Sequence, residues 1–149
     1  MAPPTAAEVK EKALALLARL DGIREAGGGT IPVEELLELV GVPADPQLQR
    51  DLAARGDLEV TFSDGAGGSF RNVGPAFTAE VGPLKLHVPA ELSGQVAHKD
   101  HAATFHFNPR HSVTGKMLFI EVHVNCLEVS DHHVAVRVPG GLLDQEYRF

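Results

Sequence analysis

The chain has 149 residues, which suits one domain or a small helical cap joined to one sheet, because folded domains commonly hold about 100 to 150 residues. Its formal net charge is −7, with 13 Lys and Arg against 20 Asp and Glu. Neither half of the chain is basic, which disfavours generic binding to nucleic acid or to anionic membranes. Trp is absent and there is one Tyr, so the core must rest on Leu, Val, Ala and seven Phe.

The cysteine content and the apolar runs bear on the cellular compartment. Cys126 is the single cysteine, which excludes an intramolecular disulfide. The segment Met1–Ala7 does not resemble an export signal, and no apolar run approaches the roughly 20 residues that a membrane-spanning helix needs. We therefore expect a cytoplasmic protein without a transmembrane segment.

The first predicted helix begins at a capping box formed by Thr5 and Glu8. Behind this box, apolar residues fall on one helical stripe, made of Val9, Ala13, Leu16, Leu17 and Leu20. The stripe predicts a helix that ends at Asp21-Gly22, where glycine interrupts the pattern.

Two further helices are predicted before Gly56. A hinge at Gly27–Gly29 precedes Thr30 and Pro32, which open the second helix, and its apolar residues are Val33, Leu36, Leu37 and Val40. The third helix starts at Asp45-Pro46 and ends at Gly56, with Leu48 and Leu52 on its apolar side.

The segment Val33–Val42, followed by Arg50-Asp51-Leu52, resembles the helix-turn-helix of bacterial winged-helix repressors, and the resemblance extends over residues 5–73. It implies that the third helix enters the major groove of DNA and that the hairpin Leu58–Val73 serves as a wing. The residues that would read DNA are then Gln47, Gln49, Arg50 and Arg55. The alternative interpretation is that three amphipathic helices cover a sheet, since such patterns are common in helical packing.

From Asp57 onward, alternation of apolar and polar residues predicts a mainly antiparallel sheet of about seven or eight strands with one apolar face. The polar face carries Lys85, His87, Gln95, Thr104, His106, Glu121, His123 and Arg137. The predicted fold class is thus α+β, with three N-terminal helices laid across a curved meander. We expect a helical cap at residues 1–56 and a β-sheet domain at residues 57–149, together forming one compact unit.

Three hairpins have a testable register, because correct antiparallel pairing places apolar residues opposite one another. The first turns at Gly82-Pro83 and pairs Phe77 with Val88, Ala79 with Leu86 and Val81 with Leu84. The second has the four-residue connection His98–His101 and pairs Leu92 with Phe107, Gly94 with Phe105 and Val96 with Ala103. The third turns at Ser130–His132 and pairs Val124 with Val138, Cys126 with Val136 and Glu128 with Val134.

Candidate chemistry is sparse. All eight histidines lie between His87 and His133, and weak candidates for a shared metal ion are His98, Asp100 and His101. Cys126 is predicted on the apolar face, where a thiol is unreactive, and no spacing typical of a nucleophile or an acid–base pair occurs. An enzyme is therefore the less favoured interpretation, and no cofactor is expected.

These observations favour a non-catalytic binding module, whose partner is either an apolar, lipid-like ligand or another protein, bound between or beside the helices and the sheet. The apolar side chains expected to line the ligand site are Phe77, Leu86, Leu92, Phe105, Phe107, Phe119 and Ile120. Two alternatives remain open: a winged-helix DNA-binding regulator with a β effector domain, and a histidine metal-binding protein.

Overall fold

A computed structural model of the chain describes residues 5–39, 57–64, 67–81, 84–117, 120–137 and 145–149. In chain order its elements are α1 (Ala6–Ala26), β1 (Gly28–Pro32), α2 (Val33–Leu39), β2 (Asp57–Asp64), β3 (Gly67–Asn72), β4 (Phe77–Val81), β5 (Leu84–Val88), β6 (Ser93–Lys99), β7 (Ala102–Phe107), β8 (Thr114–Met117), β9 (Ile120–His123), β10 (Cys126–Ser130), β11 (His133–Arg137) and β12 (Gln145–Arg148). Within the ranges described, neither helix is long and apolar enough to cross a membrane.

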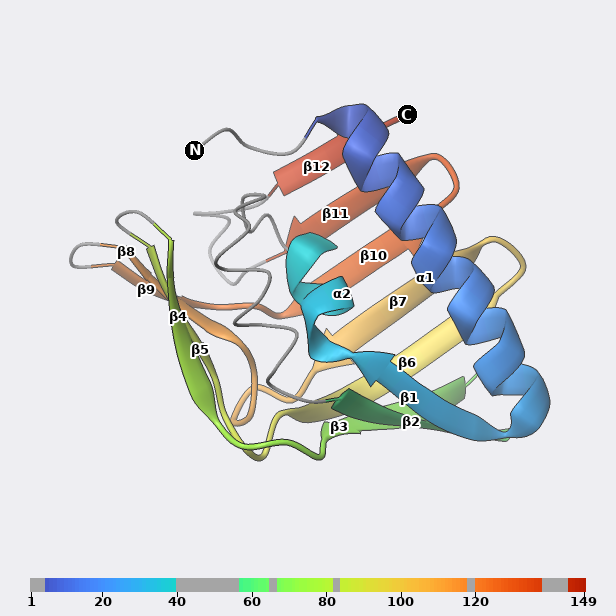
Figure 1. Cartoon of the computed structure of the whole chain (residues 1–149), viewed down its shortest axis with the longest axis horizontal. Helices are drawn as coiled ribbons and strands as arrows, with labels where there is room; N and C mark the ends of the chain where they lie inside the picture. The colour runs from blue at the N-terminus through green and yellow to red at the C-terminus, as the bar shows by residue number, and fades with distance from the viewer. Residues whose placement is uncertain (1–4, 40–56, 65–66, 82–83, 118–119, 138–144) are drawn as a thin grey trace.

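The strands form two antiparallel sheets. The main sheet has eight strands in the order β1-β2-β3-β6-β7-β10-β11-β12. The second sheet has four strands in the order β4-β5-β8-β9 and extends from one side of the main sheet as an arm (Figure 1). Helix α1 lies diagonally over one face of the main sheet, and α2 lies beside it on the same face. We call the face under α1 the inner face and the opposite one the outer face.

The predicted fold class is wrong. The residues that the structure describes are mostly β, with one long helix and the seven-residue α2, and they form two sheets in place of one meander. The segment Gly27–Gly29, predicted as a hinge, instead leads into β1, which pairs with β2 at the edge of the main sheet. The predicted third helix lies outside the described residues.

Helix α1 confirms its predicted start and extends past its predicted end. Thr5 accepts a hydrogen bond from the backbone N–H of Glu8 and caps the first turn. All five residues of the predicted stripe are buried, and Ile23 continues the stripe beyond Gly22. The helix ends at Gly27, whose φ of 83° is the left-handed conformation that glycine adopts without strain. Gly22 thus does not end the helix, because the apolar face on both sides of it packs on the sheet.

The three predicted hairpin registers fared differently. The pairing of β4 with β5 is confirmed at every predicted pair, and on its polar face Lys85 forms an ion pair with Glu80 at 3.4 Å. The pairing of β6 with β7 is shifted by two residues, so that Gly94 lies opposite Phe107 and Val96 opposite Phe105. Its turn is Asp100-His101, and Asp100 adopts a φ of 57° that aspartate tolerates in tight turns.

The pairing of β10 with β11 is shifted by one residue from the prediction. Leu127 lies opposite Val136 and Val129 opposite Val134, while Cys126 lies opposite Arg137. A shift of one residue exchanges the two faces of a strand, whereas a shift of two preserves them. The predicted faces of β6 and β7 therefore survive, and Cys126 moves to the outer side, where it is still buried.

The core lies between α1 and the inner face. One row of directly paired residues crosses six strands from β2 to β11 and consists of Phe62, Gly68, Val96, Phe105, Leu127 and Val136. The Phe70 ring packs edge-on against Phe105 and Phe107, with centroid distances of 5.6 Å and 5.4 Å. Tyr147 and Phe149 pack against this core from the C-terminal strand.

The Phe70 ring packs against the backbone of β6 at Gly94, where a side chain would occupy the position of the ring. A substitution at position 94 tests this packing. A Cβ atom at position 94 would lie 2.1 Å from the carbonyl oxygen of His106 and 2.8 Å from Cζ of Phe70. We expect Gly94→Ala to lower the free energy of unfolding by at least about 2 kcal/mol. Chemical denaturation of the purified protein measures this change.

Gly22→Ala is the matched control, because a Cβ atom at position 22 in α1 meets nothing within 4 Å. Alanine in a helix should there raise the free energy of unfolding by about 0.5–1 kcal/mol. Equal effects of the two substitutions would contradict the packing described for Gly94.

Candidate functional site

The outer face of the main sheet carries a continuous row of polar side chains. Direct pairing across β2, β3, β6, β7, β10 and β11 aligns Thr61, Ser69, Gln95, His106, Cys126 and Arg137. The first four of these side chains are exposed, as expected for residues that alternate with the buried core positions. We call this series the outer row.

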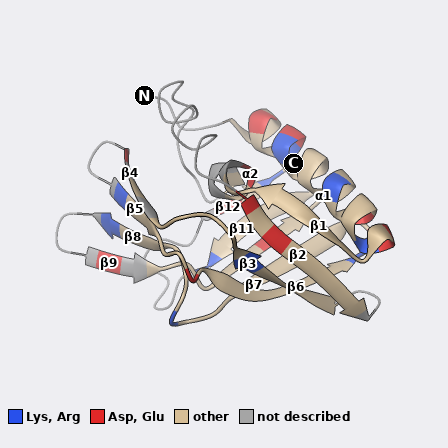
Figure 2. Cartoon of the chain, turned by 60° about the horizontal axis from the view of Figure 1, so that its bottom comes forward, with Lys and Arg blue, Asp and Glu red and all other residues tan. Residues whose placement is uncertain are grey.

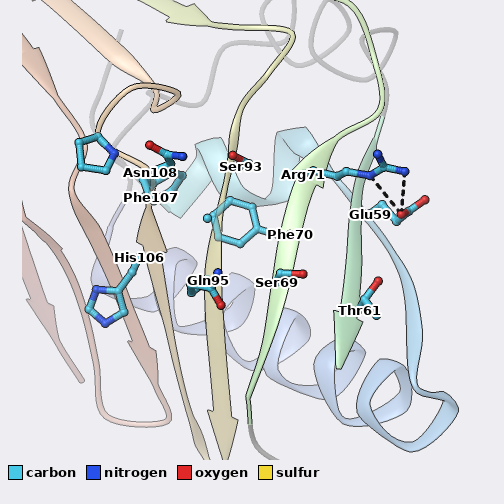
Figure 3. A pocket seen from close by; sticks show the side chains of 12 residues that line it. Glu59, Thr61, Ser69, Phe70, Arg71, Ser93, Gln95, His106, Phe107 and Asn108 are labelled. Atoms are coloured by element: carbon cyan, nitrogen blue, oxygen red, sulfur yellow. Dashed lines mark hydrogen bonds and ion pairs between the residues drawn. The ribbon is translucent and has the colours of Figure 1, made fainter. Parts of the chain in front are cut away.

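A groove of about 650 Å³ lies over the first half of the outer row. Figure 3 shows it from the outer side, with the helices behind the strands. Its lining residues are Glu59, Thr61, Ser69, Phe70, Arg71, Ser93, Gly94, Gln95, His106, Phe107, Asn108 and Pro109. The volume falls within the range of roughly 300–1,000 Å³ that is usual for small-molecule sites.

The groove is nearly neutral in charge, and its lining mixes polar with apolar groups. Arg71 forms an ion pair with Glu59, with 3.2 Å between Nη2 and Oε1, so the two formal charges in the groove balance. The remaining polar groups are hydroxyls, side-chain amides and one imidazole, and each of them can both donate and accept hydrogen bonds. In the view of Figure 2, acidic and basic residues are mixed along α1 and the strands.

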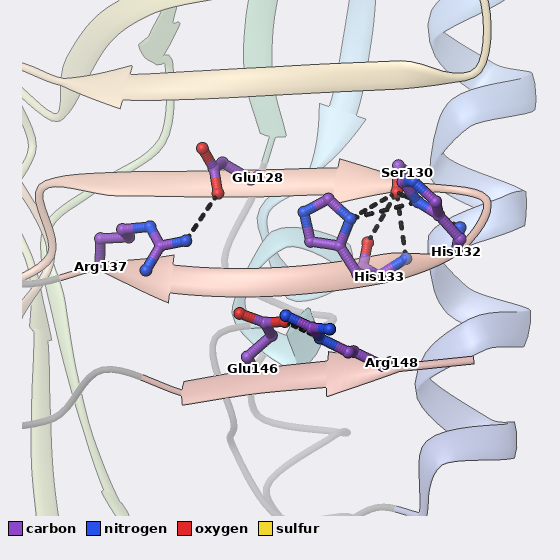
Figure 4. Close-up of polar contacts among 7 residues, drawn as sticks. All are labelled: Glu128, Ser130, His132, His133, Arg137, Glu146 and Arg148. Atoms are coloured by element: carbon purple, nitrogen blue, oxygen red, sulfur yellow. Dashed lines mark hydrogen bonds and ion pairs between the residues drawn. The ribbon is translucent and has the colours of Figure 1, made fainter.

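A second pocket, of about 360 Å³, lies on the outer face of β11 and β12 and is lined by His132, His133, Arg137, Glu146 and Arg148 (Figure 4). Arg137 contacts Glu128 on β10, with 3.3 Å between Nη2 and Oε2. Arg148 donates a hydrogen bond from Nε to Glu146, which lowers the pKa of that carboxyl and keeps it ionised.

Buried Ser130 organises the two histidines of this pocket. Its Oγ accepts the backbone N–H groups of His132 at 3.3 Å and His133 at 3.0 Å, which closes the turn between β10 and β11. The same Oγ lies within hydrogen-bond distance of Nδ1 of both imidazoles, at 2.9 Å for His133. The two rings are adjacent, with centroids 4.9 Å apart.

A third and smaller pocket, of about 170 Å³, is lined by Pro109, Ser112, His123, Val124 and Asn125. Ser112 and Thr114 both place a hydroxyl near Nδ1 of His123, at 3.4 Å and 3.3 Å. On the other side of the ring, Glu121 lies 3.7 Å from Nε2. Both oxygen-to-nitrogen distances exceed the roughly 2.6–3.2 Å between a nucleophile and its base, so we assign these contacts to structural hydrogen bonding.

The predicted ligand-lining residues are mostly part of the core. Leu86, Leu92, Phe105 and Phe107 are all buried members of the main hydrophobic cluster. Phe107 also lines the groove on the outer face. The side chains of Phe77 and Ile120 and the whole of Phe119 lie outside what the structure describes.

The weak metal candidates do not converge. His98 points into the core beneath α1, whereas Asp100 and His101 are exposed in the turn that follows β6. In the part of the chain that the structure describes, no group of three or more His, Cys, Asp and Glu side chains is arranged to hold a metal ion. The predicted DNA-reading residues Gln47, Gln49, Arg50 and Arg55 lie outside the described residues.

Sequence patterns found only part of the groove. Gln95 and His106 were correctly placed on the polar face by alternation, and both line the groove. Ser69, Arg71 and Glu59 were assigned only to a hairpin and not to a site. The signal that could have found them is the pairing of β3 with β6, which joins two hairpins and places Ser69 beside Gln95.

Cys126 lies in the outer row between His106 and Arg137, where a reactive thiol would be exposed to a ligand. Its side chain is buried, and burial raises the pKa of the thiol, to which Glu128 also contributes. A thiol with a raised pKa is a poor nucleophile at neutral pH. Cys126 thus interrupts the polar row without adding a reactive group.

Comparison with protein-family models, with curated proteins and with solved structures gives no match to this chain. The functional argument therefore depends on the geometry and chemistry of the outer face.

His98 is the most deeply buried titratable side chain near the helix, and its environment makes stability depend on pH. Its Nε2 lies 3.3 Å from Oδ1 of Asp21, yet neither ring nitrogen makes a hydrogen bond within the described residues. Arg24 donates a hydrogen bond to the backbone oxygen of His98 at 2.9 Å. Burial, assisted by the charge of Arg24 and opposed by Asp21, lowers the pKa of His98 from its ordinary value of 6.5.

We expect the free energy of unfolding to fall as pH decreases through about 6.5, because His98 then binds a proton in the unfolded chain but stays neutral in the folded protein. This group contributes a slope of at most about 1.4 kcal/mol per pH unit. His98→Leu should reduce the slope, whereas His101→Gln in the exposed turn should leave it unchanged. Denaturation at several pH values tests this; an identical slope in His98→Leu and the unmodified protein would contradict it.

Proposed function

We propose that this protein is a non-catalytic binding module that holds a neutral, polyhydroxylated ligand of sugar-like chemistry in the groove on the outer face of its main sheet. The observation that carries the proposal is the outer row, in which Thr61, Ser69, Gln95 and His106 lie side by side along a groove of about 650 Å³. These four side chains come from four neighbouring strands, so a rigid sheet fixes their spacing.

The chemistry of the groove supports a neutral ligand. The charges of Arg71 and Glu59 balance each other, so an ionic ligand gains no net attraction there. Hydroxyl and amide side chains both donate and accept, which matches the hydroxyl groups of a sugar-like molecule. Pro109 adds an exposed apolar ring at the rim, against which C–H groups of such a ligand can pack.

An apolar ligand between helix and sheet is less well supported by the described residues. Leu92, Phe105 and Phe107 are almost completely buried and contribute to a continuous core with α1. Close-packed interiors leave few voids, so these residues stabilise the fold by filling the core. The outer groove offers open volume and exposed hydrogen-bonding groups on the same sheet.

The proposal is tested by titrating the protein with a panel of neutral tetrasaccharides and following the side-chain amide signals of Gln95 and Asn108 by NMR. At least one sugar should shift both signals in a saturable manner. Gln95→Ala should weaken its binding about three- to tenfold, the equivalent of one net hydrogen bond of about 0.5–1.5 kcal/mol.

Lys85→Ala on β5 is the control, because this exposed side chain belongs to the arm and not to the groove. It should bind the same sugar as tightly as the unmodified protein. The absence of saturable shifts with every sugar, or equal binding by Gln95→Ala, would contradict the proposal.

A further inference from the structure

The pocket on β11 and β12 offers many hydrogen-bond donors and one competing acceptor. Arg137 uses Nη2 for Glu128 and Arg148 uses Nε for Glu146, and each guanidinium carries further N–H groups that these two contacts do not use. Glu146 is the only carboxylate among the five lining residues. A ligand complementary to these donors must itself supply acceptor oxygens.

Ser130 fixes which side of each imidazole serves this pocket. Its Oγ lies within hydrogen-bond distance of Nδ1 of both His132 and His133, and the two Nδ1 atoms are 3.2 Å apart. Among the described residues, no hydrogen bond or ion pair involves either Nε2. A hydrogen bond between the two Nδ1 atoms makes one of them the acceptor, so in the neutral pair one Nε2 donates and the other accepts. One proton taken up by the pair turns both Nε2 atoms into donors, on rings that the buried serine holds in place.

The charge of the pocket depends on these two rings. With both imidazoles neutral, Glu128 and Glu146 balance Arg137 and Arg148, and Asp131 adds a negative charge 3.9 Å from Nδ1 of His132. A proton taken up by the pair of His132 and His133 adds one positive charge beside the two guanidinium groups. Paired arginines and histidinium groups are favourable partners for phosphate and carboxylate oxygens.

We propose that this pocket is an oxyanion site, that it accepts a phosphate group, and that it binds this group most strongly when the pair of His132 and His133 carries one added proton. The site goes beyond the proposed sugar-like ligand of the groove, and it shares no lining residue with the groove. It uses the far end of the same outer face, on strands β11 and β12.

The test is a titration of the full chain with inorganic phosphate, followed by NMR of the imidazole signals of His132 and His133, with chloride at matched ionic strength as the ion control. We expect saturable shifts at about pH 6 and binding about tenfold weaker at about pH 8, where imidazoles are neutral. Shifts of the same size with chloride would overturn the proposal.

Two single substitutions at exposed side chains locate the site. Arg148→Gln and His132→Gln should each weaken phosphate binding about fivefold or more, since each removes a charge-assisted donor. Lys85→Gln removes one positive charge from the arm and should leave binding within about twofold of the unmodified protein. Unchanged binding in both Arg148→Gln and His132→Gln would overturn the proposal.

Two further measurements separate the possible sources of the oxyanion and the two proposed sites. Tighter binding of phenyl phosphate than of inorganic phosphate would support a phosphate group carried by a larger molecule, and equal binding would support a free oxyanion. Gln95→Ala should weaken sugar binding about three- to tenfold and leave phosphate binding unchanged. Each proposal can therefore fail without the other.

Discussion

The packing of Phe70 over Gly94 is the constraint on which the main sheet depends. Phe70 on β3 and Phe107 on β7 are the direct neighbours of Gly94 on either side, and the two rings meet edge-on at 5.4 Å. A side chain at position 94 would collide with the Phe70 ring on β3 and with the carbonyl oxygen of His106 on β7, so the glycine fixes how β3, β6 and β7 align. Through that alignment it also fixes the opposite face, where Ser69, Gln95 and His106 become neighbours.

Alternation in the sequence predicted local strand faces well, but it did not determine which hairpins join. The pairing of β4 with β5 was predicted at every position because its short turn leaves one register that matches apolar residues. The pairing of β6 with β7 was displaced by two residues because a tight turn at Asp100-His101 satisfies the same alternation as a longer connection. Both choices bury the same face.

In the N-terminal part, the sequence predicted a helix well but missed a strand that depends on long-range pairing. The apolar stripe of α1 was readable because its 3.6-residue period extends over several turns. The segment Gly28–Pro32 carries no such period, and it becomes a strand only because β2 presents an edge for it to pair with. Long-range pairing of this kind also creates the groove, whose lining comes from segments as far apart as Glu59 and Asn108. A single sequence does not specify such pairings, because many strands could satisfy the same edge.

The two faces of the main sheet differ in composition: the inner face packs in the core, and the outer face carries polar groups. The inner face supplies stability through α1 and the aromatic cluster, and it also buries His98 at a position that disfavours protonation. The outer face carries the hydrogen-bonding groups, with a charge-balanced groove towards β2 and a histidine- and arginine-lined pocket towards β12. Because each strand contributes alternately to both faces, packing beneath the sheet sets the spacing of groups above it.

The arm consists of two hairpins that are insertions between strands of the main sheet. The hairpin β4-β5 is inserted between β3 and β6, which are direct neighbours in the main sheet. The hairpin β8-β9 is inserted between β7 and β10, which are also direct neighbours. Each insertion therefore leaves the main sheet and returns to it at adjacent strands, and the two are joined to each other by the pairing of β5 with β8. Loss of one hairpin alone would uncover β5 or β8, the strand through which the remaining hairpin now pairs, and an exposed strand edge favours aggregation. The two insertions are thus a single structural unit, to be kept or removed together.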